Sequence, residues 1–177
     1  MENIRIIKEG LDVSKILQQV LNNEDDWHGV QKFENIAGKL NTTNFIPITI
    51  GMVMTEEHNI KDSELQQNTI FHDKYTEIVK WLGENNCGDH ARAAFFKLIP
   101  GGKVGWHVDD GKYYLTKDRY HLSLQGTYKY EVEDEHIIVQ PGTFFWFNNK
   151  KYHQATNVGM IDRITFVFDV PKSEKNP

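Results

Sequence analysis

The sequence is poor in the features that would place it outside the class of ordinary globular proteins. Cys87 is its single cysteine, so no internal disulfide can form, and the opening residues MENIRIIKEG lack the apolar run of a secretory signal. No stretch approaches the roughly 20 apolar residues that a membrane-spanning helix needs. We therefore expect a cytoplasmic protein in a reducing compartment, without membrane insertion.

The chain also lacks a strong excess of charge of either sign. Its formal net charge is -5 and its pI is about 5.9, with lysine and arginine interspersed among the acids. Non-specific nucleic-acid binding needs clustered basic side chains, so this pattern argues against a nucleic-acid partner, although it leaves room for a local basic patch. With 177 residues, 39% of them hydrophobic, the chain can bury one core, and we expect residues 1–177 to form a single domain. The oligomeric state cannot be read from the sequence.

Residues 1–90 mix helix and strand signals. Apolar residues recur at helical spacing in DVSKILQQVLNN (12–23) and HDKYTEIVKWLGENN (72–86), which predicts two helices. FIPITIGMVM (45–54) is typical of a strand, and the polar, acidic residues 55–68 predict a surface loop.

After Ala91 the pattern changes to short β-type runs separated by turn residues. Their spacing of roughly 8 to 12 residues is typical of an all-β sandwich or barrel, and a jelly roll fits best. We predict strands at residues 92–99, 104–109, 119–124, 127–132, 136–140, 143–147, 152–157 and 163–169. The helices of the first half would pack against one outer face, which explains why ITFVFDV is apolar on both sides. Residues 171–177 would form a frayed tail.

The segment HVD suggests a metal site. Alternate side chains of a strand share a face, so His107 and Asp109 point the same way. An imidazole and a carboxylate suit Fe(II), Mn(II) or Zn(II), but a transition metal needs a third ligand. His153 lies in the strand-like run KYHQATN, and an antiparallel pairing could bring it beside His107. His-x-Asp alone occurs by chance, so a structural histidine beside a turn carboxylate remains the alternative.

The other histidines in turns or near helix ends fit a solvated surface position better; they are His28, His58, His72, His90 and His136.

Two arginines point to an anionic ligand. Arg163 opens the strand RITFVFDV, and Ile164, Phe166 and Phe168 face away from it, so its guanidinium heads into the space behind the sheet. A buried cation needs an anionic partner, such as a small dicarboxylate or, alternatively, Asp169 or Asp162 in a structural salt bridge. In DRYHLSL, Arg119 and His121 share one face and are candidates to line the same cavity.

These residues lie in segments with a family resemblance. Between Arg92 and Val170, the segments RAAFFKLIPGGKVGWHVDD, DRYHLSLQG, PGTFFWFNNKKYHQATN and DRITFVFDV resemble the aspartyl/asparaginyl β-hydroxylase family of Fe(II)- and 2-oxoglutarate-dependent dioxygenases. The resemblance covers somewhat under half of the chain. It implies a cupin-like double-stranded β-helix with residues 91–170 as the catalytic core, and O2 and 2-oxoglutarate as co-substrates.

The resemblance also implies roles for individual residues. Iron would be held by His107, Asp109 and His153. Arg163 would pair with the distal carboxylate of 2-oxoglutarate, and Arg119 and His121 would help to hold this co-substrate. Some members have no carboxylate at the position of Asp109, and the large accessory domains of the membrane-anchored animal relatives are missing here.

We therefore predict hydroxylation of an amino-acid side chain, free or in a peptide or protein. Oxygenation of a nucleobase or small metabolite, and a non-catalytic cupin-like binding module, remain alternatives. Tyr113 and Tyr114 are expected at the mouth of the site, in contact with substrate. Phe144, Trp146 and Phe147 are expected as apolar walls, unless this aromatic strand is simply core.

Overall fold

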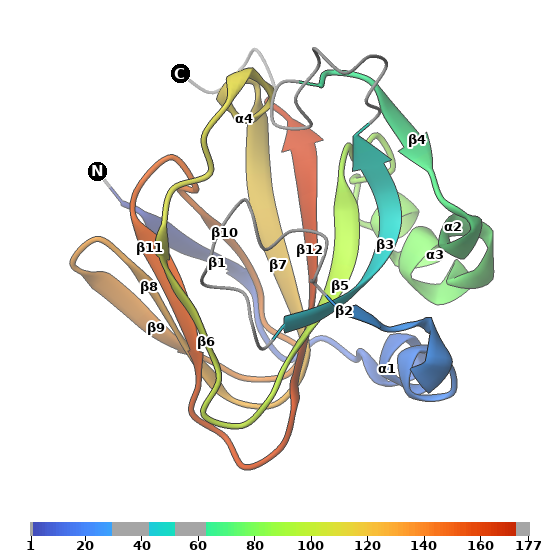
Figure 1. Cartoon of the computed structure of the whole chain (residues 1–177), viewed down its shortest axis with the longest axis horizontal. Helices are drawn as coiled ribbons and strands as arrows, with labels where there is room; N and C mark the ends of the chain where they lie inside the picture. Colours follow the sequence, from blue (N-terminus) through green and yellow to red (C-terminus); the bar gives the residue numbers. More distant parts are fainter. Residues whose placement is uncertain (1, 30–42, 52–62, 173–177) are drawn as a thin grey trace.

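The computed structural model describes residues 2–29, 43–51 and 63–172, and within these two antiparallel sheets face each other (Figure 1). In hydrogen-bonded order, the larger sheet contains β1 (Ile4–Lys8), β10 (Phe144–Phe147), β7 (Lys117–Gln125), β12 (Arg163–Pro171), β5 (Ala93–Leu98), β3 (Thr43–Gly51) and β2 (His28–Gly29), with β4 (Gln66–Asn68) beside β3. The smaller sheet contains β6 (Lys103–His107), β11 (His153–Asn157), β8 (Tyr128–Val132) and β9 (Glu135–Val139). The result is the expected mainly-β fold, a double-stranded β-helix.

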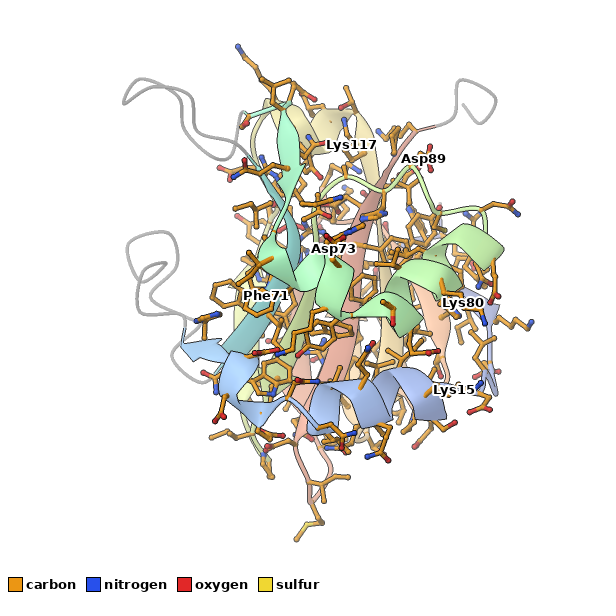
Figure 2. The ribbon with its side chains drawn as sticks, turned by 90° about the vertical axis from the view of Figure 1, so that its right-hand side faces the viewer. Lys15, Phe71, Asp73, Lys80, Asp89 and Lys117 are labelled. Atoms are coloured by element: carbon orange, nitrogen blue, oxygen red, sulfur yellow. The ribbon has the colours of Figure 1, made fainter. Side chains whose placement is uncertain are left out.

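Helices cover the outer face of the larger sheet. They are α1 (Ser14–Leu21), the 3-10 turn η1 (Glu24–Asp26), α2 (Ile70–Lys74) and α3 (Thr76–Glu84), and Figure 2 looks onto this layer. The ring of Trp81 in α3 meets the rings of Phe144 and Phe168 edge-on at 5.2 and 6.1 Å. Each large apolar side chain buried in this way contributes about 1.5–3 kcal/mol. Lys15 and Lys80 lie on the exposed side of the helices.

The alternation of β12 separates the core from the site. Ile164, Phe166 and Phe168 pack into the core beneath the helices, whereas Arg163 and Asp169 face the smaller sheet. A second apolar cluster fills part of the space between the sheets, with residues Ile4, Tyr128, Tyr130, Val132, Val139, Phe145, Phe147 and Ala155. The space left beside β3, β5 and β6 is a cavity.

The structure confirms all eight strands predicted after Ala91, the strand at 45–51, and helices within 12–23 and 72–86. The helices do pack on one outer face, as predicted. The surface-loop prediction is wrong at residues 66–68, which form β4 at the edge of the sheet, where polar side chains are tolerated. The rest of that loop up to residue 62, the end of the strand at 52–54, and the tail at 173–177 lie outside the described residues.

Several short elements were not anticipated, namely β1, α2 and α4, as well as η1 and β2. β1 was not predicted because IRIIK shows no sustained alternation of polar and apolar residues, and in the structure only the side chain of Ile4 is buried. α2 is separated from α3 by Tyr75, whose φ of -93° and ψ of 61° are not helical. α4 (Lys112–Leu115) is a single turn after β6. Within the described residues, none of the helices is long and apolar enough to cross a membrane.

Candidate metal centre and cavity

A cavity of about 380 Å³ lies between the two sheets. Its walls come from β3, β5, β7 and β12 on one side and from β6, β8 and β11 on the other. Arg163 lies in its lining, and so do His107, Asp109 and His153. The cavity therefore contains the predicted metal ligands together with the predicted anion-binding arginine.

His107 and His153 face each other across paired strands. They are register partners in β6 and β11, and their ring centroids lie 4.2 Å apart, as the predicted antiparallel pairing requires. The Nε2 atom of each ring is 3.9 Å from a carboxylate oxygen of Asp109, Oδ1 for His107 and Oδ2 for His153. One ligand atom from each residue lies within 4.8 Å of the others, the one such group among the described residues.

The backbone sets the tautomer of both imidazoles. Nδ1 of His107 lies 2.7 Å from the carbonyl oxygen of Gly105, and Nδ1 of His153 lies 2.8 Å from that of Lys151. A carbonyl oxygen only accepts, so each Nδ1 carries the hydrogen and each Nε2 presents a lone pair. Burial lowers the pKa of His153 to about 4, so this ring is neutral near pH 7. The donor set fits a divalent cation.

Asp109 is held by two residues on other strands and loops. Its Oδ2 accepts hydrogen bonds from Nη1 of Arg119 at 2.8 Å and from Nδ2 of Asn149 at 3.1 Å, and its N–H donates to the Asn149 carbonyl at 3.0 Å. Burial acts to raise the pKa of Asp109, but the charge of Arg119, together with the nearby imidazoles and the hydrogen bond from Asn149, outweighs it and lowers that pKa. The carboxylate stays ionised and ready to bind a cation.

Asp109 does not belong to a strand. β6 ends at His107, so the predicted strand 104–109 is two residues too long, and the bonds to Asn149, not the pleat, place the carboxylate. Asn149 is fully buried and went unnoticed in the sequence, because an asparagine in a polar turn gives no signal of what it contacts. Asp110 is exposed and lies outside the ligand group.

Arg163 lines the cavity and is 3% exposed. Its Nε donates to Oγ1 of Thr165 at 2.8 Å, and its guanidinium lies 4.2 Å from the ring centre of Tyr128. Among the described residues no carboxylate lies within 4.0 Å of it, so the alternative of a salt bridge to Asp169 or Asp162 is not what the structure has. A buried cation without a counter-charge is costly and calls for an anionic ligand.

His121 and Tyr130 flank the same part of the cavity. The rings of Tyr130, Phe145 and Phe147 surround His121 edge-on at 5.0 to 5.1 Å. Burial first, and then the charge of Arg163, lower the pKa of His121 well below its usual value, so the ring is neutral. Its Nδ1 is buried and has no hydrogen-bond partner within the described part of the chain.

Tyr130 was missed, although the alternation of Tyr128, Tyr130 and Val132 could have indicated an inward face. It is 3% exposed, lines the cavity, and stacks on His153 at 6.2 Å between ring centres. Burial raises the pKa of Tyr130 well above its usual value, so its hydroxyl remains a donor.

Arg119 lies between two carboxylates. Its Nε and Nη2 bind Oδ1 and Oδ2 of Asp169 at 2.7 and 2.9 Å, while its Nη1 binds Asp109. Asp169, one of the two partners considered for Arg163, thus pairs with Arg119 instead, its register partner on the neighbouring strand.

Four of the aromatic predictions separate into two groups. Tyr114 and Phe147 line the cavity. Tyr113 is fully buried, and its hydroxyl donates to Oδ2 of Asp169 at 3.0 Å, so the expectation that it contacts substrate is wrong. Trp146 faces the other side of the sheet, where its Nε1 donates to Asp118 at 3.3 Å, so it does not line the site either.

Phe144, the third predicted wall residue, packs beneath the helices and also lies away from the cavity. In the short strand FFWF only Phe145 and Phe147 face inward.

Part of the cavity wall is built on β3 and β5. Phe45 pairs with Phe96 and Pro47 pairs with Ala94, and all four side chains are part of the lining. The sequence indicated a strand here but not that it belongs to the site.

The remaining histidines lie elsewhere. His28 and His136 are exposed, and His72 stacks on His90 at 6.4 Å. His90 was expected at the surface but is partly buried, and its Nε2 lies 3.1 Å from Oγ1 of Thr49. His58 lies outside the described residues.

Comparison with known proteins gives one family match. A sequence model for aspartyl/asparaginyl beta-hydroxylases matches residues 51–173. No curated protein sequence matches this chain.

Among solved structures, a predicted oxalate decarboxylase from Thermotoga maritima is 18% identical over 50% of this chain and 73% of its own, with a TM-score of 0.41. The Cnp3 cupin domain of Schizosaccharomyces pombe is 12% identical over 46% of this chain and 56% of its own, with a TM-score of 0.40. A cupin 2 conserved barrel domain protein from Salinispora arenicola is 11% identical over 45% of this chain and 61% of its own, with a TM-score of 0.37.

Proposed function

The chain belongs to the aspartyl/asparaginyl beta-hydroxylase family, and from this premise we propose that it is an Fe(II)- and 2-oxoglutarate-dependent dioxygenase that hydroxylates an amino-acid side chain. One observation carries the proposal. The ligand atoms of His107, Asp109 and His153 lie within 4.8 Å of one another in a cavity that also contains the buried guanidinium of Arg163.

The donor set determines which metal suits the site. Two neutral imidazoles and one carboxylate form a facial triad that leaves three positions of an octahedral ion open, which is typical of non-heme Fe(II) oxygenases. Fe(II) held there would supply O2 activation, coupled to the conversion of 2-oxoglutarate to succinate and CO2. The protein's part is to hold both histidines in the Nε2-binding tautomer and to keep Asp109 ionised.

The part of the cavity around Arg163 would bind 2-oxoglutarate. Arg163 has no carboxylate partner among the described residues, so it is available for the distal carboxylate, a charge-assisted contact that contributes roughly 2–5 kcal/mol when buried. The hydroxyl of Tyr130 and the ring of His121 border the same space and would bind the same co-substrate. Phe147 supplies an apolar wall.

The part of the cavity beside β3 and β5 would receive the substrate. Phe45, Pro47 and Phe96 form one wall and Tyr114 lies in the lining near the metal ligands. This space suits a side chain presented by a free amino acid, a peptide or a protein, with O2 as the second co-substrate.

Succinate release tests the proposal. Protein loaded anaerobically with Fe(II) is mixed with 2-oxoglutarate, O2 and a panel of amino acids and peptides, and succinate is measured with the His107→Ala variant as control. Substrate-stimulated succinate that is absent from the variant is expected. Stimulation by nucleobases alone would favour the small-metabolite alternative, and tight 2-oxo acid binding without any turnover would favour a binding module.

A further inference from the structure

Arg119 links the candidate metal ligand Asp109 to a second buried carboxylate, Asp169. Resting on the proposed function, we infer that Arg119 and Asp169 form a positioning pair that fixes Asp109 so that a single oxygen, Oδ1, faces the metal. This assigns Arg119 to the metal centre and leaves Arg163 as the arginine that binds the co-substrate.

The guanidinium is locked in place by its first partner. Arg119 and Asp169 are register partners on β7 and β12, and Nε and Nη2 of the arginine contact separate oxygens of the carboxylate at 2.7 and 2.9 Å. A fork of two parallel hydrogen bonds fixes orientation as well as distance. Only Nη1 remains to reach the other side, and it lies 2.8 Å from Oδ2 of Asp109.

Asp169 is itself buried and held by groups other than Arg119. It is 0% exposed, its Oδ2 accepts from the hydroxyl of Tyr113 at 3.0 Å, and its backbone N–H donates to the carbonyl of Arg92 at 2.9 Å. Apart from Arg119, the Tyr113 hydroxyl holds the carboxylate and the sheet holds its backbone, so the position of Asp169 does not depend on Arg119 alone. Through its hydrogen bond to Oδ2, Arg119 therefore holds the carboxylate of Asp109 in one position.

The consequence at Asp109 is an asymmetry between its two oxygens. Oδ2 accepts from both Arg119 and Asn149, whereas no described residue donates a hydrogen bond to Oδ1. The lone pairs of Oδ2 are largely used by these donors, while those of Oδ1 are free for a cation. Oδ1 lies 3.9 Å from Nε2 of His107 and Oδ2 lies 3.9 Å from Nε2 of His153, so the hydrogen bonds, and not these distances, distinguish the two oxygens.

The contrast with Arg163 separates the two arginines. Each of the three guanidinium nitrogens of Arg119 already contacts a protein carboxylate, so a ligand carboxylate would compete with both. Arg163 makes one hydrogen bond, to a hydroxyl, and faces the cavity.

Cobalt(II) titration without 2-oxoglutarate tests the inference, because Co(II) binding reports the site and its visible absorption reports coordination geometry. The variants are Arg119→Gln, Arg119→Lys and Asp169→Asn, with Arg163→Gln as the matched control and circular dichroism as the check on folding. We expect Arg119→Gln and Asp169→Asn to weaken Co(II) binding by about 10- to 100-fold and to change the absorption spectrum, because losing the partners that orient a ligand costs that much. Arg119→Lys should recover part of the loss, and Arg163→Gln should stay within about threefold of the parent.

The outcomes separate the inference from the function on which it rests. If the parent itself does not bind Co(II), the proposed function fails. If the parent binds and Asp169→Asn has the parent's affinity and spectrum, the positioning pair is wrong, even where Arg119→Gln fails to fold. Unchanged Co(II) binding by Arg119→Gln, together with weakened 2-oxoglutarate binding, would mean that Arg119 binds the co-substrate and does not position Asp109.

Discussion

His107 and His153 lie side by side on antiparallel strands with their rings 4.2 Å apart, and each ring is bound through Nδ1 to a backbone carbonyl two residues before it. Both Nε2 atoms therefore point at the carboxylate of Asp109 without any rearrangement. The site is therefore preorganised for a cation.

The metal-free protein should lose stability in acid through His153. Its pKa is about 4 when folded against a usual value of 6.5, so the unfolded chain binds the proton more tightly and stability is lost as the pH falls from about 6.5 to 4. Between pH 7 and 4.5, the parent's free energy of unfolding should fall by roughly 2–3 kcal/mol more than that of His153→Asn. Urea denaturation at both pH values measures the difference, and equal losses would contradict the assigned neutral ring.

Arg163→Ala should weaken the binding of 2-oxoglutarate without weakening the binding of the metal. Losing a buried charge-assisted pair worth roughly 2–5 kcal/mol predicts a rise of at least 30-fold in the KM for 2-oxoglutarate. Arg163→Lys should restore only part of the affinity for 2-oxoglutarate, since an ammonium cannot reproduce the two parallel hydrogen bonds of a guanidinium to a carboxylate. Succinate assays give the KM and Co(II) titration gives the metal affinity; an unchanged KM would make Arg163 purely structural.

Tyr130→Phe should produce a smaller effect of the same kind. The hydroxyl is a neutral donor beside a bound carboxylate, and a hydrogen bond to a charged group contributes about 1.5–3 kcal/mol. Binding of 2-oxoglutarate to the Mn(II)-loaded protein, followed by calorimetry, should weaken about 10- to 100-fold. The hydroxyl makes no hydrogen bond to another described residue, so the melting temperature is expected to stay close to the parent's. Unchanged binding would remove Tyr130 from the co-substrate site.

Two neighbouring carboxylates give an internal control at the metal. Asp109→Ala removes a ligand and should weaken anaerobic Fe(II) binding by more than about tenfold and abolish most succinate formation. Asp110→Ala should keep Fe(II) affinity within about threefold, because Asp110 is exposed and outside the ligand group. Full activity in a folded Asp109→Ala protein would mean a two-histidine site.

Local periodicity was enough to predict what depends on one strand alone. The alternation of RITFVFDV correctly placed Arg163 opposite Phe166 and Phe168, and turn residues marked all eight later strands. Periodicity failed where both faces of a strand are apolar. Nothing in FFWF indicates that Phe147 faces the cavity and that Trp146 faces the other side of the sheet.

Contacts between segments that are distant in the chain could not be predicted from the sequence. The pairing of Arg119 with Asp169 depends on the register of β7 and β12, whose partners are 50 residues apart. Asp109 lies beside the two histidines, as predicted, but strand alternation is not the reason. The strand β6 ends before Asp109, and a hydrogen bond from Asn149 holds its carboxylate.

A crystal structure of the Mn(II)-loaded protein, with the ion located by its anomalous scattering, tests the metal centre most directly. The account predicts one ion bound by Nε2 of His107, Nε2 of His153 and Oδ1 of Asp109. An ion whose coordination omits His153, or one bound elsewhere in the cavity, would contradict it.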